Sequence, residues 1–407
     1  MRILIGGVPF GRDNVGDEAI LACQVGILRE ACPGAELTVS TDDGERTATK
    51  LGVRTVELFG FAPPWTKARL EEELARHDLF YWGGATGLSD YPHIPLSILD
   101  AAIQRGLRTV LFGVGMNDEL NPVHARLLPG KRRTLLRAMS KLTLGRRDWV
   151  AAWEQRREQR IRASIARLLN SVDLAVLRDP ESYTQVILSG ARPRPHLLVG
   201  ADPAVLLPSA PWKDTLWPVQ VLDALHRSGR RIGFCISAQR EVADTAGLVR
   251  LLDRLVEAGE RTLFLIPMNP VTDAELMAGL HARMRHKARA VVVSGRYEPE
   301  EIQALAAKMD VVVSSRLHLL ILAANNHVPI VGISRGSKVD YFLKPYGLTA
   351  AGTVEACDFT ALAAEIERLL DGRAAFEEQS RRVRHELLGR LDLTRAALGG
   401  LMKEMGG

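Results

Sequence analysis

Short apolar runs alternate with longer amphipathic stretches along most of the chain. Ten of these runs predict β-strands, at residues 2–5, 36–41, 79–82, 109–114, 174–177, 231–236, 262–267, 290–294, 311–314 and 330–332. The stretches between most of them have apolar positions at helical spacing. Strands that alternate with helices are typical of βαβ units, so the pattern predicts an α/β protein with parallel sheets.

Four prolines lie close together between the fifth and sixth predicted strands: Pro203, Pro208, Pro211 and Pro218. Proline interrupts helices and strands alike, so we expect an interdomain linker at residues 203–217. A chain of 407 residues also exceeds what one core usually organises. We therefore expect an N-terminal domain at 1–205, a C-terminal domain at 206–374, and a long charged helix at 375–407 that packs back on the domains.

The composition, 46% hydrophobic and 25% charged, is that of a globular protein in water. No apolar run approaches the roughly 18–20 residues that cross a bilayer. The N-terminus enters a glycine-rich loop instead of the apolar core of a signal peptide, which predicts a cytoplasmic protein. The four cysteines are scattered and histidines form no cluster, so we expect neither disulfides nor a His/Cys metal site. Scattered aspartates leave a metal requirement open.

The positive charge of the chain is concentrated in residues 124–170. This segment holds thirteen Lys or Arg against three acidic residues, whereas the whole chain has a net charge of only +5. It contains a predicted helix with an apolar side formed by Trp149, Trp153, Ile161, Ile165, Leu168 and Leu169. A basic amphipathic helix of this kind can lie on an anionic membrane, or it can be a solvated helix with an ordinary buried face. Nucleic-acid binding is disfavoured because aromatic residues are only 5% and no known motif is present.

The first predicted strand runs into the loop Gly6–Gly16 and then into a helix near Asp17. Glycines let the backbone approach a ligand, and a helix N-terminus offers unpaired amides. The spacing matches neither G-x-G-x-x-G nor a P-loop, which argues against both types of nucleotide site. Asp17 has two interpretations, as a functional carboxylate or as the cap of the helix.

The strand at 311–314 is followed by Ser315-Arg316-Leu317-His318 and an apolar helix. Ligands bind at such strand ends in open α/β sheets. A permanent cation and a titratable imidazole two residues apart suit an anionic substrate that undergoes proton transfer. The alternative is an ordinary ion pair and a structural histidine.

Two further strand ends carry cations. Arg335 and Lys338 follow the strand at 330–332, and Arg178 directly follows the strand at 174–177. If these ends converge, they match a small ligand with phosphate and carboxylate groups. Otherwise they are solvated basic loops. After Arg178, either Asp179 or Ser182 is expected to cap the next helix.

Four segments, in this order, resemble the polysaccharide pyruvyl transferase family: Asn14-x-Gly16-Asp17-Glu18-Ala19-Ile20-Leu21, Arg178-Asp179-x-x-Ser182, Ser315-Arg316-Leu317-His318 and Lys338-Val339. The strand ends Trp82-Gly83-Gly84-Ala85 and Gly113-Val114-Gly115-Met116 also fit, and the similarity covers roughly residues 1–345. The resemblance implies a GT-B-like α/β fold, in which two Rossmann-like domains with parallel sheets face each other across a cleft. It also implies transfer of pyruvate from phosphoenolpyruvate to two hydroxyls of a sugar, which forms a cyclic ketal.

By position, the resemblance assigns the phosphoenolpyruvate site to Arg178, Arg316, Leu317, His318 and Lys338. It assigns the acceptor side to Asn14, Gly16, Asp17, Gly83 and Gly84. His318 would be the general acid that protonates the enol carbon, and Asp17 a catalytic base. Phosphoenolpyruvate is then a co-substrate, and no cofactor is expected. The acceptor would be a nucleotide- or lipid-linked glycan, a precursor of the cell envelope or of an exopolysaccharide, with residues 124–170 in peripheral contact with the inner membrane as one interpretation.

One departure from the family pattern concerns Ala85, where the family usually continues its glycine run. The extra methyl group predicts a different acceptor pocket. Two other functions remain open at this stage. One is a GT-B glycosyltransferase that uses a nucleotide sugar, and the other is a family member that binds ligands without catalysis.

Overall fold

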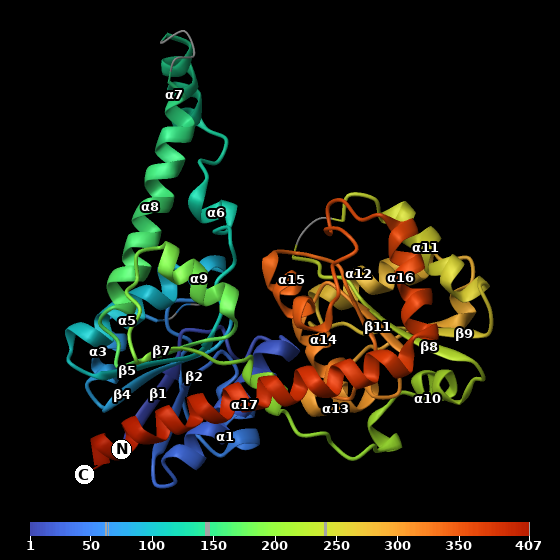
Figure 1. Cartoon of the computed structure of the whole chain (residues 1–407), viewed down its shortest axis with the longest axis horizontal. Coiled ribbons are helices and arrows are strands. Elements are labelled where there is room, and N and C mark those ends of the chain that lie inside the picture. Colours follow the sequence, from blue (N-terminus) through green and yellow to red (C-terminus); the bar gives the residue numbers. More distant parts are fainter. Residues whose placement is uncertain (62, 64, 143–146, 240–241, 407) are drawn as a thin grey trace. The chain divides into compact units, whose positions relative to one another are not determined.

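The computed structural model describes residues 1–61, 63, 65–142, 147–239 and 242–406. The chain forms two compact units (Figure 1). Unit 1 contains Met1–Pro9, Ile27–Asp202 and Leu393–Gly407, and unit 2 contains Phe10–Gly26 and Pro203–Asp392. Residues 10–26 therefore group with the second half of the chain, although they lie near the N-terminus.

Unit 1 is built on a parallel sheet of seven strands in the order β3-β2-β1-β4-β5-β6-β7. The strands are β1 (Arg2–Gly6), β2 (Glu36–Ser40), β3 (Arg54–Val56), β4 (Leu79–Gly83), β5 (Arg108–Val114), β6 (Leu174–Leu177) and β7 (Leu197–Val199). Its helices are the end of α1 (Val15–Ala31), α2 (Gly44–Leu51), α3 (Lys67–Leu74), α4 (Gly87–Asp90), α5 (His93–Gln104), α6 (Pro122–Ala125), α7 (Lys131–Leu142), α8 (Trp149–Leu169) and α9 (Pro180–Leu188).

Unit 2 has a parallel sheet of five strands in the order β10-β9-β8-β11-β12. The strands are β8 (Arg230–Cys235), β9 (Arg261–Leu265), β10 (Ala290–Val292), β11 (Val311–Ser314) and β12 (Ile330–Gly332). The helices, with four 3₁₀ turns, are η1 (Pro203–Leu206), η2 (Asp214–Leu216), α10 (Val219–His226), α11 (Thr245–Glu257), α12 (Thr272–Arg283), η3 (Lys287–Arg289), α13 (Pro299–Ala306), α14 (Leu317–Ala324), α15 (Ser337–Leu343), η4 (Lys344–Tyr346), α16 (Phe359–Asp371) and most of α17 (Arg373–Gly406).

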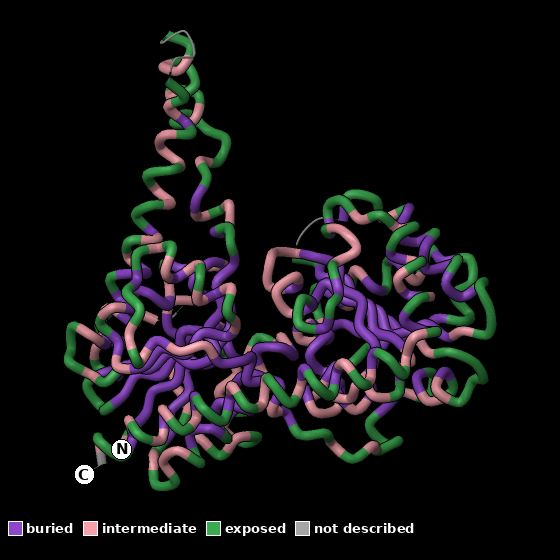
Figure 2. The backbone as a smooth tube through the Cα atoms, in the orientation of Figure 1, coloured by how far each residue is buried: buried purple, intermediate pink, exposed green. Residues whose placement is uncertain are grey.

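All ten predicted strands are confirmed, as is the parallel α/β class. In both sheets the central strands are almost wholly buried (Figure 2), which explains why they appear in the sequence as continuous apolar runs. β3 and β7 were not predicted. Each has only three residues and lies at an edge of its sheet. β3 (Arg-Thr-Val) has little apolar character, and β7 (Leu-Leu-Val) is apolar but too short to stand out.

The long C-terminal helix α17 contributes to both units, since its residues up to Asp392 group with unit 2 and those from Leu393 with unit 1. In unit 2 the ring of Phe376 stacks on Tyr346 with centroids 5.8 Å apart. In unit 1, Leu398 and Met402 are buried. No helix among the described residues is long and apolar enough to span a membrane.

Three aspartates extend the sheets by one residue at the amino ends of the strands. Asp78, Asp173 and Asp310 each directly precede a central strand. The carboxylates accept the backbone N–H of the residue opposite on the neighbouring strand, at 2.7 Å from Arg2, 2.8 Å from Thr109 and 2.7 Å from Arg231. The same aspartates donate their own N–H to the carbonyls of those three residues. Each pair thereby fixes the register of two adjacent strands.

We expect Asp173→Ala and Asp310→Ala each to lower the free energy of unfolding by about 1–3 kcal/mol, because a partly buried strand-end N–H loses a charged acceptor. Denaturant titration followed by circular dichroism measures this. Asp223→Ala, at an exposed position on α10, is the control and should change stability by less than about 0.5 kcal/mol. Equal effects at all three positions would contradict a role in strand register.

Candidate active site

The carboxyl ends of the strands of unit 2 carry the polar residues. β8 and β11 lie side by side, while the chain continues from β8 towards β9 and β10 on one side and from β11 towards β12 on the other. Such a reversal of strand order is where ligands bind in doubly wound sheets. Ser237 follows β8, Asn269 and Asp273 follow β9, Arg316 follows β11, and Lys338 follows β12.

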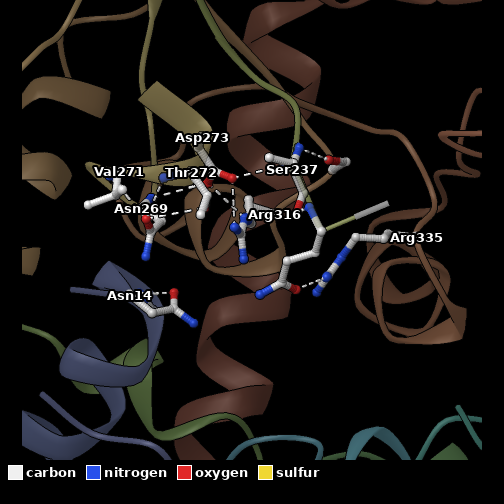
Figure 3. Close-up of polar contacts among 12 residues, drawn as sticks. Asn14, Ser237, Asn269, Val271, Thr272, Asp273, Arg316 and Arg335 are labelled. Carbon is white, nitrogen blue, oxygen red and sulfur yellow. Dashed lines mark hydrogen bonds and ion pairs between the residues drawn. The ribbon is translucent and has the colours of Figure 1, made fainter. Parts of the chain in front are cut away.

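A buried ion pair joins two of these strand ends (Figure 3). Arg316 donates from Nε to Oδ2 of Asp273 at 2.9 Å and from Nη2 to Oδ1 at 2.7 Å. Asp273 is fully buried and Arg316 nearly so. The carboxylate also accepts the backbone N–H of Ala238 at 3.0 Å and of Asn269 at 3.1 Å. This fork geometry holds the guanidinium in one orientation and leaves Nη1 as the nitrogen that is not bonded to Asp273.

The loop after β1 is bound to this edge of unit 2. The N–H of Val15 donates to the carbonyl of Met268 at 3.0 Å, and Nδ2 of Asn269 donates to the carbonyl of Arg12 at 3.2 Å. Arg296 forms an ion pair with Asp13, whose backbone has a positive φ of 57°. These contacts bring the N-terminal end of α1 to the strand ends of unit 2.

The start of α1 excludes capping as the role of Asp17. The helix begins at Val15, directly after Asn14, and Oδ1 of Asn14 accepts the N–H of Gly16 at 3.2 Å. Asp17 lies inside the first turn, where its Oδ2 accepts Nδ2 of Asn14 at 2.7 Å. The capping interpretation is therefore wrong.

His318, in the first turn of α14, packs directly on Gly16. A Cβ added at Gly16 would lie 2.5 Å from Cγ of His318 and 2.9 Å from its Cβ. Only glycine leaves room for the imidazole at this point. The segments around residues 16 and 318 are thus in van der Waals contact within unit 2.

Asp17 is buried beside this imidazole and near two cations. Burial raises the pKa of the Asp17 carboxyl above its ordinary value, while His318, the hydrogen bond from Asn14, Lys338 and Arg316 each oppose the rise. Burial penalises the charged carboxylate, and the neighbouring positive charges favour it. A carboxyl with this balance is suited to take up and release a proton.

Lys338 lies in the first turn of α15 and is half-buried. The preceding Gly336 has a φ of 148°, and Oγ of Ser334 donates to Oδ2 of Asp340 at 2.7 Å, which shapes this loop. Arg335 is hydrogen-bonded to Gln239. Leu317 is buried in the core, so its side chain has a packing role.

The remaining candidates belong to unit 1, at the carboxyl ends of the adjacent strands β4, β5 and β6. Arg178 is buried, its Nε donates to Oδ2 of Asp179 at 3.1 Å, and its Nη1 is 3.9 Å from Oδ2 of Asp202. Its Nη2 has no hydrogen-bond partner among the described residues. A Cβ at Gly115 would lie 2.7 Å from Cζ of Arg178, so that glycine makes room for the guanidinium.

The glycine turn after β4 contacts the end of β5, the strand that lies between β4 and β6. Gly83 ends β4, Gly84 has a φ of 88° and Ala85 a φ of 62°. The carbonyl of Ala85 accepts the N–H of Gly115 at 2.7 Å. Ala85 therefore adopts the left-handed conformation that glycine would take without strain.

After β6, Asp179 caps α9 by accepting the N–H of Ser182 at 2.6 Å, which confirms one of the two expected caps. Oγ of Ser182 instead accepts the N–H of Met116 at 2.9 Å. The hydroxyl of Ser182 in α9 thus binds the backbone of Met116, two residues after β5.

The structure brings together Asn14, Gly16, Asp17, Arg316, His318 and Lys338 in unit 2, and places Gly83, Gly84 and Arg178 in unit 1. The sequence had grouped Asp17 with Gly83 and Gly84, on the acceptor side. It missed Asp273 and Asn269 altogether. Their position just after the predicted strand at 262–267 was the available signal, since ligands bind at such strand ends, as at Arg316.

The fold class agrees with solved structures. A putative UDP-N-acetylglucosamine 2-epimerase from Listeria monocytogenes has a TM-score of 0.59 at 13% identity, over 93% of this chain and 90% of that chain. HepE of Anabaena, solved with UDP and glucose, has a TM-score of 0.59 at 15% identity, over 100% and 99%. The UDP-GlcNAc 2-epimerase of Neisseria meningitidis, bound to UDP-GlcNAc, has a TM-score of 0.57 at 10% identity, over 99% of this chain and 100% of that chain. At these identities the likeness establishes a fold with two Rossmann-like domains, of the GT-B type.

Sequence places the chain more narrowly within that class. The model of the polysaccharide pyruvyl transferase family matches residues 14–337, and the chain belongs to this family. It is therefore a transferase. Among curated proteins, none matches the chain in sequence.

We expect Gly16→Ala to lower turnover by about 100-fold, because the new methyl group displaces the imidazole of His318. The matched control is Gly26→Ala in the same helix, where the added Cβ meets nothing within 4 Å. Alanine at this exposed helical position should raise stability by about 1 kcal/mol and leave turnover unchanged. Steady-state kinetics and thermal melting of both variants measure the two effects. Wild-type turnover in Gly16→Ala would show that the position of His318 does not matter.

Proposed function

We propose that the protein transfers the pyruvyl group of phosphoenolpyruvate to two hydroxyls of one sugar in a cell-envelope or exopolysaccharide precursor, with release of phosphate. The observation that carries this proposal is the contact of His318 with Gly16 beside the buried Asp17 and near Lys338 and Arg316. The group combines two proton-exchanging side chains with cations. Phosphoenolpyruvate requires both, since it is an anion whose enol carbon must be protonated.

In this mechanism, His318 donates a proton to the methylene carbon of phosphoenolpyruvate, and an oxocarbenium-like centre forms at the neighbouring carbon. One sugar hydroxyl attacks this centre and gives its proton to Asp17. The C–O bond to phosphate then breaks, and the second hydroxyl attacks to close the ketal. Of the two hydroxyl protons, one replaces the proton used for the new methyl group and the other leaves with phosphate.

The cations have a separate role. Lys338 and Nη1 of Arg316 are suited to the phosphate and carboxylate, because cationic donors form the stronger, charge-assisted hydrogen bonds to such oxygens. Arg178, buried at the end of β6 in unit 1, is a third cation that we assign to phosphoenolpyruvate. The acceptor is a nucleotide- or lipid-linked glycan. We assign its binding to the loop that contains Gly83 and Gly84. We place the reaction in the cytoplasm, where phosphoenolpyruvate is made.

A nucleotide-sugar glycosyltransferase is the second candidate, because HepE of Anabaena was solved with UDP-glucose. The two functions differ in their products. Incubation with phosphoenolpyruvate and a panel of linked sugars should release inorganic phosphate and add one pyruvyl ketal to the sugar, as mass spectrometry detects. Release of UDP from a sugar donor, with no consumption of phosphoenolpyruvate, would favour the second candidate.

We expect His318→Gln to reduce product formation by about 100-fold or more, since glutamine cannot supply the proton. Binding of phosphoenolpyruvate, measured by calorimetry, should remain within a few-fold of wild type. His385→Gln, at an exposed position on α17, is the control and should behave as wild type. Turnover that survives in His318→Gln would remove the general-acid role.

Asp17→Asn should abolish turnover without loss of stability at neutral pH. Burial raises the pKa of Asp17, so the ionised carboxylate costs folding free energy above that pKa, and the neutral amide avoids this cost. As pH falls through the folded-state pKa, wild-type Asp17 becomes neutral as well and the stability difference should disappear. Melting curves from acid to neutral pH measure this convergence. A variant that is less stable than wild type at neutral pH would contradict it.

A further inference from the structure

Helices α7 and α8 form a hairpin that projects from the sheet of unit 1 (Figure 1). The two helices pack against each other. Among the twelve residues of α7 none is buried, and the far part of the hairpin has almost no buried positions (Figure 2). A short helix with no buried residues gains little stability from packing. Its exposed surface therefore points to a role other than packing in the core.

The apolar side of α8 is not that surface. Ile161, Ile165 and Leu168 are buried in unit 1, where the second half of α8 contacts α5 and α9. The sequence had offered this side as a membrane-binding face. These residues and Leu169 are core, whereas Trp149 and Trp153, in the first half of α8, are half-buried.

The apolar side of α7 is in solvent. Leu135 and Leu142 are seven residues apart, and Ala138 lies between them at helical spacing, so the three share one face. Leu135 is 62% exposed and Leu142 is 83% exposed. Leu128, in the loop before the helix, is 61% exposed. Full burial of each leucine side chain would stabilise the protein by about 1.5–3 kcal/mol, and the exposed leucines of α7 do not provide this stabilisation.

The interior of the hairpin is held by polar and cation–π contacts instead. Arg132 of α7 lies over the ring of Trp153 at 4.9 Å, and Arg157 lies over the same ring at 5.2 Å. Oγ of Ser140 accepts the N–H of Trp149 at 3.0 Å. Leu135, three residues after Arg132, borders this contact face, and both it and Leu142 are exposed to solvent.

Strong positive charge flanks the exposed leucines. The sequence of α7, KRRTLLRAMSKL, has five cations and no acidic residue. Lys131, Arg132, Arg137 and Lys141 are all exposed. A short helix with exposed leucines between cations has the composition of helices that lie at the surface of an anionic bilayer.

We propose that α7 docks on the anionic surface of a lipid bilayer, with Leu135 and Leu142 inserted among the acyl chains and Lys131 and Lys141 at the lipid phosphates. An acidic protein fits the surface less well, since a few leucines on one short helix offer much less than the roughly 800 Å² per partner of a stable protein interface. Each cation near an anionic membrane adds to the binding free energy. The charge of α7 therefore suits electrostatic binding to anionic lipids in general, without recognition of one headgroup. The proposal does not depend on the transferred group, although it would bring the protein to a lipid-linked acceptor.

Flotation of the full-length protein with phosphatidylglycerol-containing vesicles tests the docking directly, without any substrate. We expect the wild type to bind these vesicles, to bind pure phosphatidylcholine at least about tenfold more weakly, and to lose affinity between about 50 and about 500 mM NaCl. Leu135→Gln/Leu142→Gln and Lys131→Gln/Lys141→Gln should each weaken binding about tenfold or more. The matched control is Leu188→Gln on α9, since that leucine is 71% exposed but lies outside the hairpin.

All variants alter exposed side chains, so their melting temperatures should equal that of the wild type. Wild-type protein that does not float with anionic vesicles at low salt would overturn the proposal. So would α7 variants that bind as the wild type does, or a Leu188→Gln variant that loses as much affinity. Transfer to a water-soluble acceptor should be unchanged in the α7 variants, which separates failure of docking from failure of the proposed reaction.

Discussion

The ion pair of Asp273 with Arg316 is the interaction on which the candidate site depends. Both side chains are buried, and two charges removed from water are stable only when they are paired and fully hydrogen-bonded. Asp273 meets this condition with the forked guanidinium and two backbone N–H groups, from the loops after β8 and β9. Three adjacent strand ends are thereby joined through one carboxylate, and His318 follows Arg316 by only two residues.

The pair also changes the electrostatics of the site. A sequence with Arg316, His318 and Lys338 at neighbouring strand ends looks strongly cationic, yet Asp273 compensates the charge of Arg316. The bonds from Nε and Nη2 to Asp273 fix the guanidinium of Arg316 in one orientation, and this orientation sets the direction of Nη1. Asp17 adds a carboxyl whose charge is disfavoured by burial and favoured by its neighbours, and burial, the larger effect, raises its pKa.

The sequence was sufficient for the parts of the fold that depend on local pattern. Central strands such as β5 and β11 are buried on both faces and appear as apolar runs, whereas the short edge strands β3 and β7 have no comparable signal. Strand ends and family motifs were sufficient to single out Asp17, Arg316, His318 and Lys338, which the structure brings together in unit 2. Asp273 was missed because an acidic residue in the first turn of a helix is ordinary, and its partner is 43 residues away. The grouping of Asp17 with unit 2 was also not predictable, since chain order assigns residues 10–26 to the first domain and long-range contacts assign them to the second.

The division of α17 between the units has a consequence for biosynthesis. Unit 1 includes Leu393–Gly407, and buried Leu398 and Met402 belong to its core. The ribosome makes these residues only after the whole of unit 2 has been synthesised. Unit 1 therefore cannot complete its core until unit 2 has been synthesised, and one cut in the chain does not separate the two units. Any change that displaces the segment from Leu393 onward removes Leu398 and Met402 from the core of unit 1, far from them in sequence.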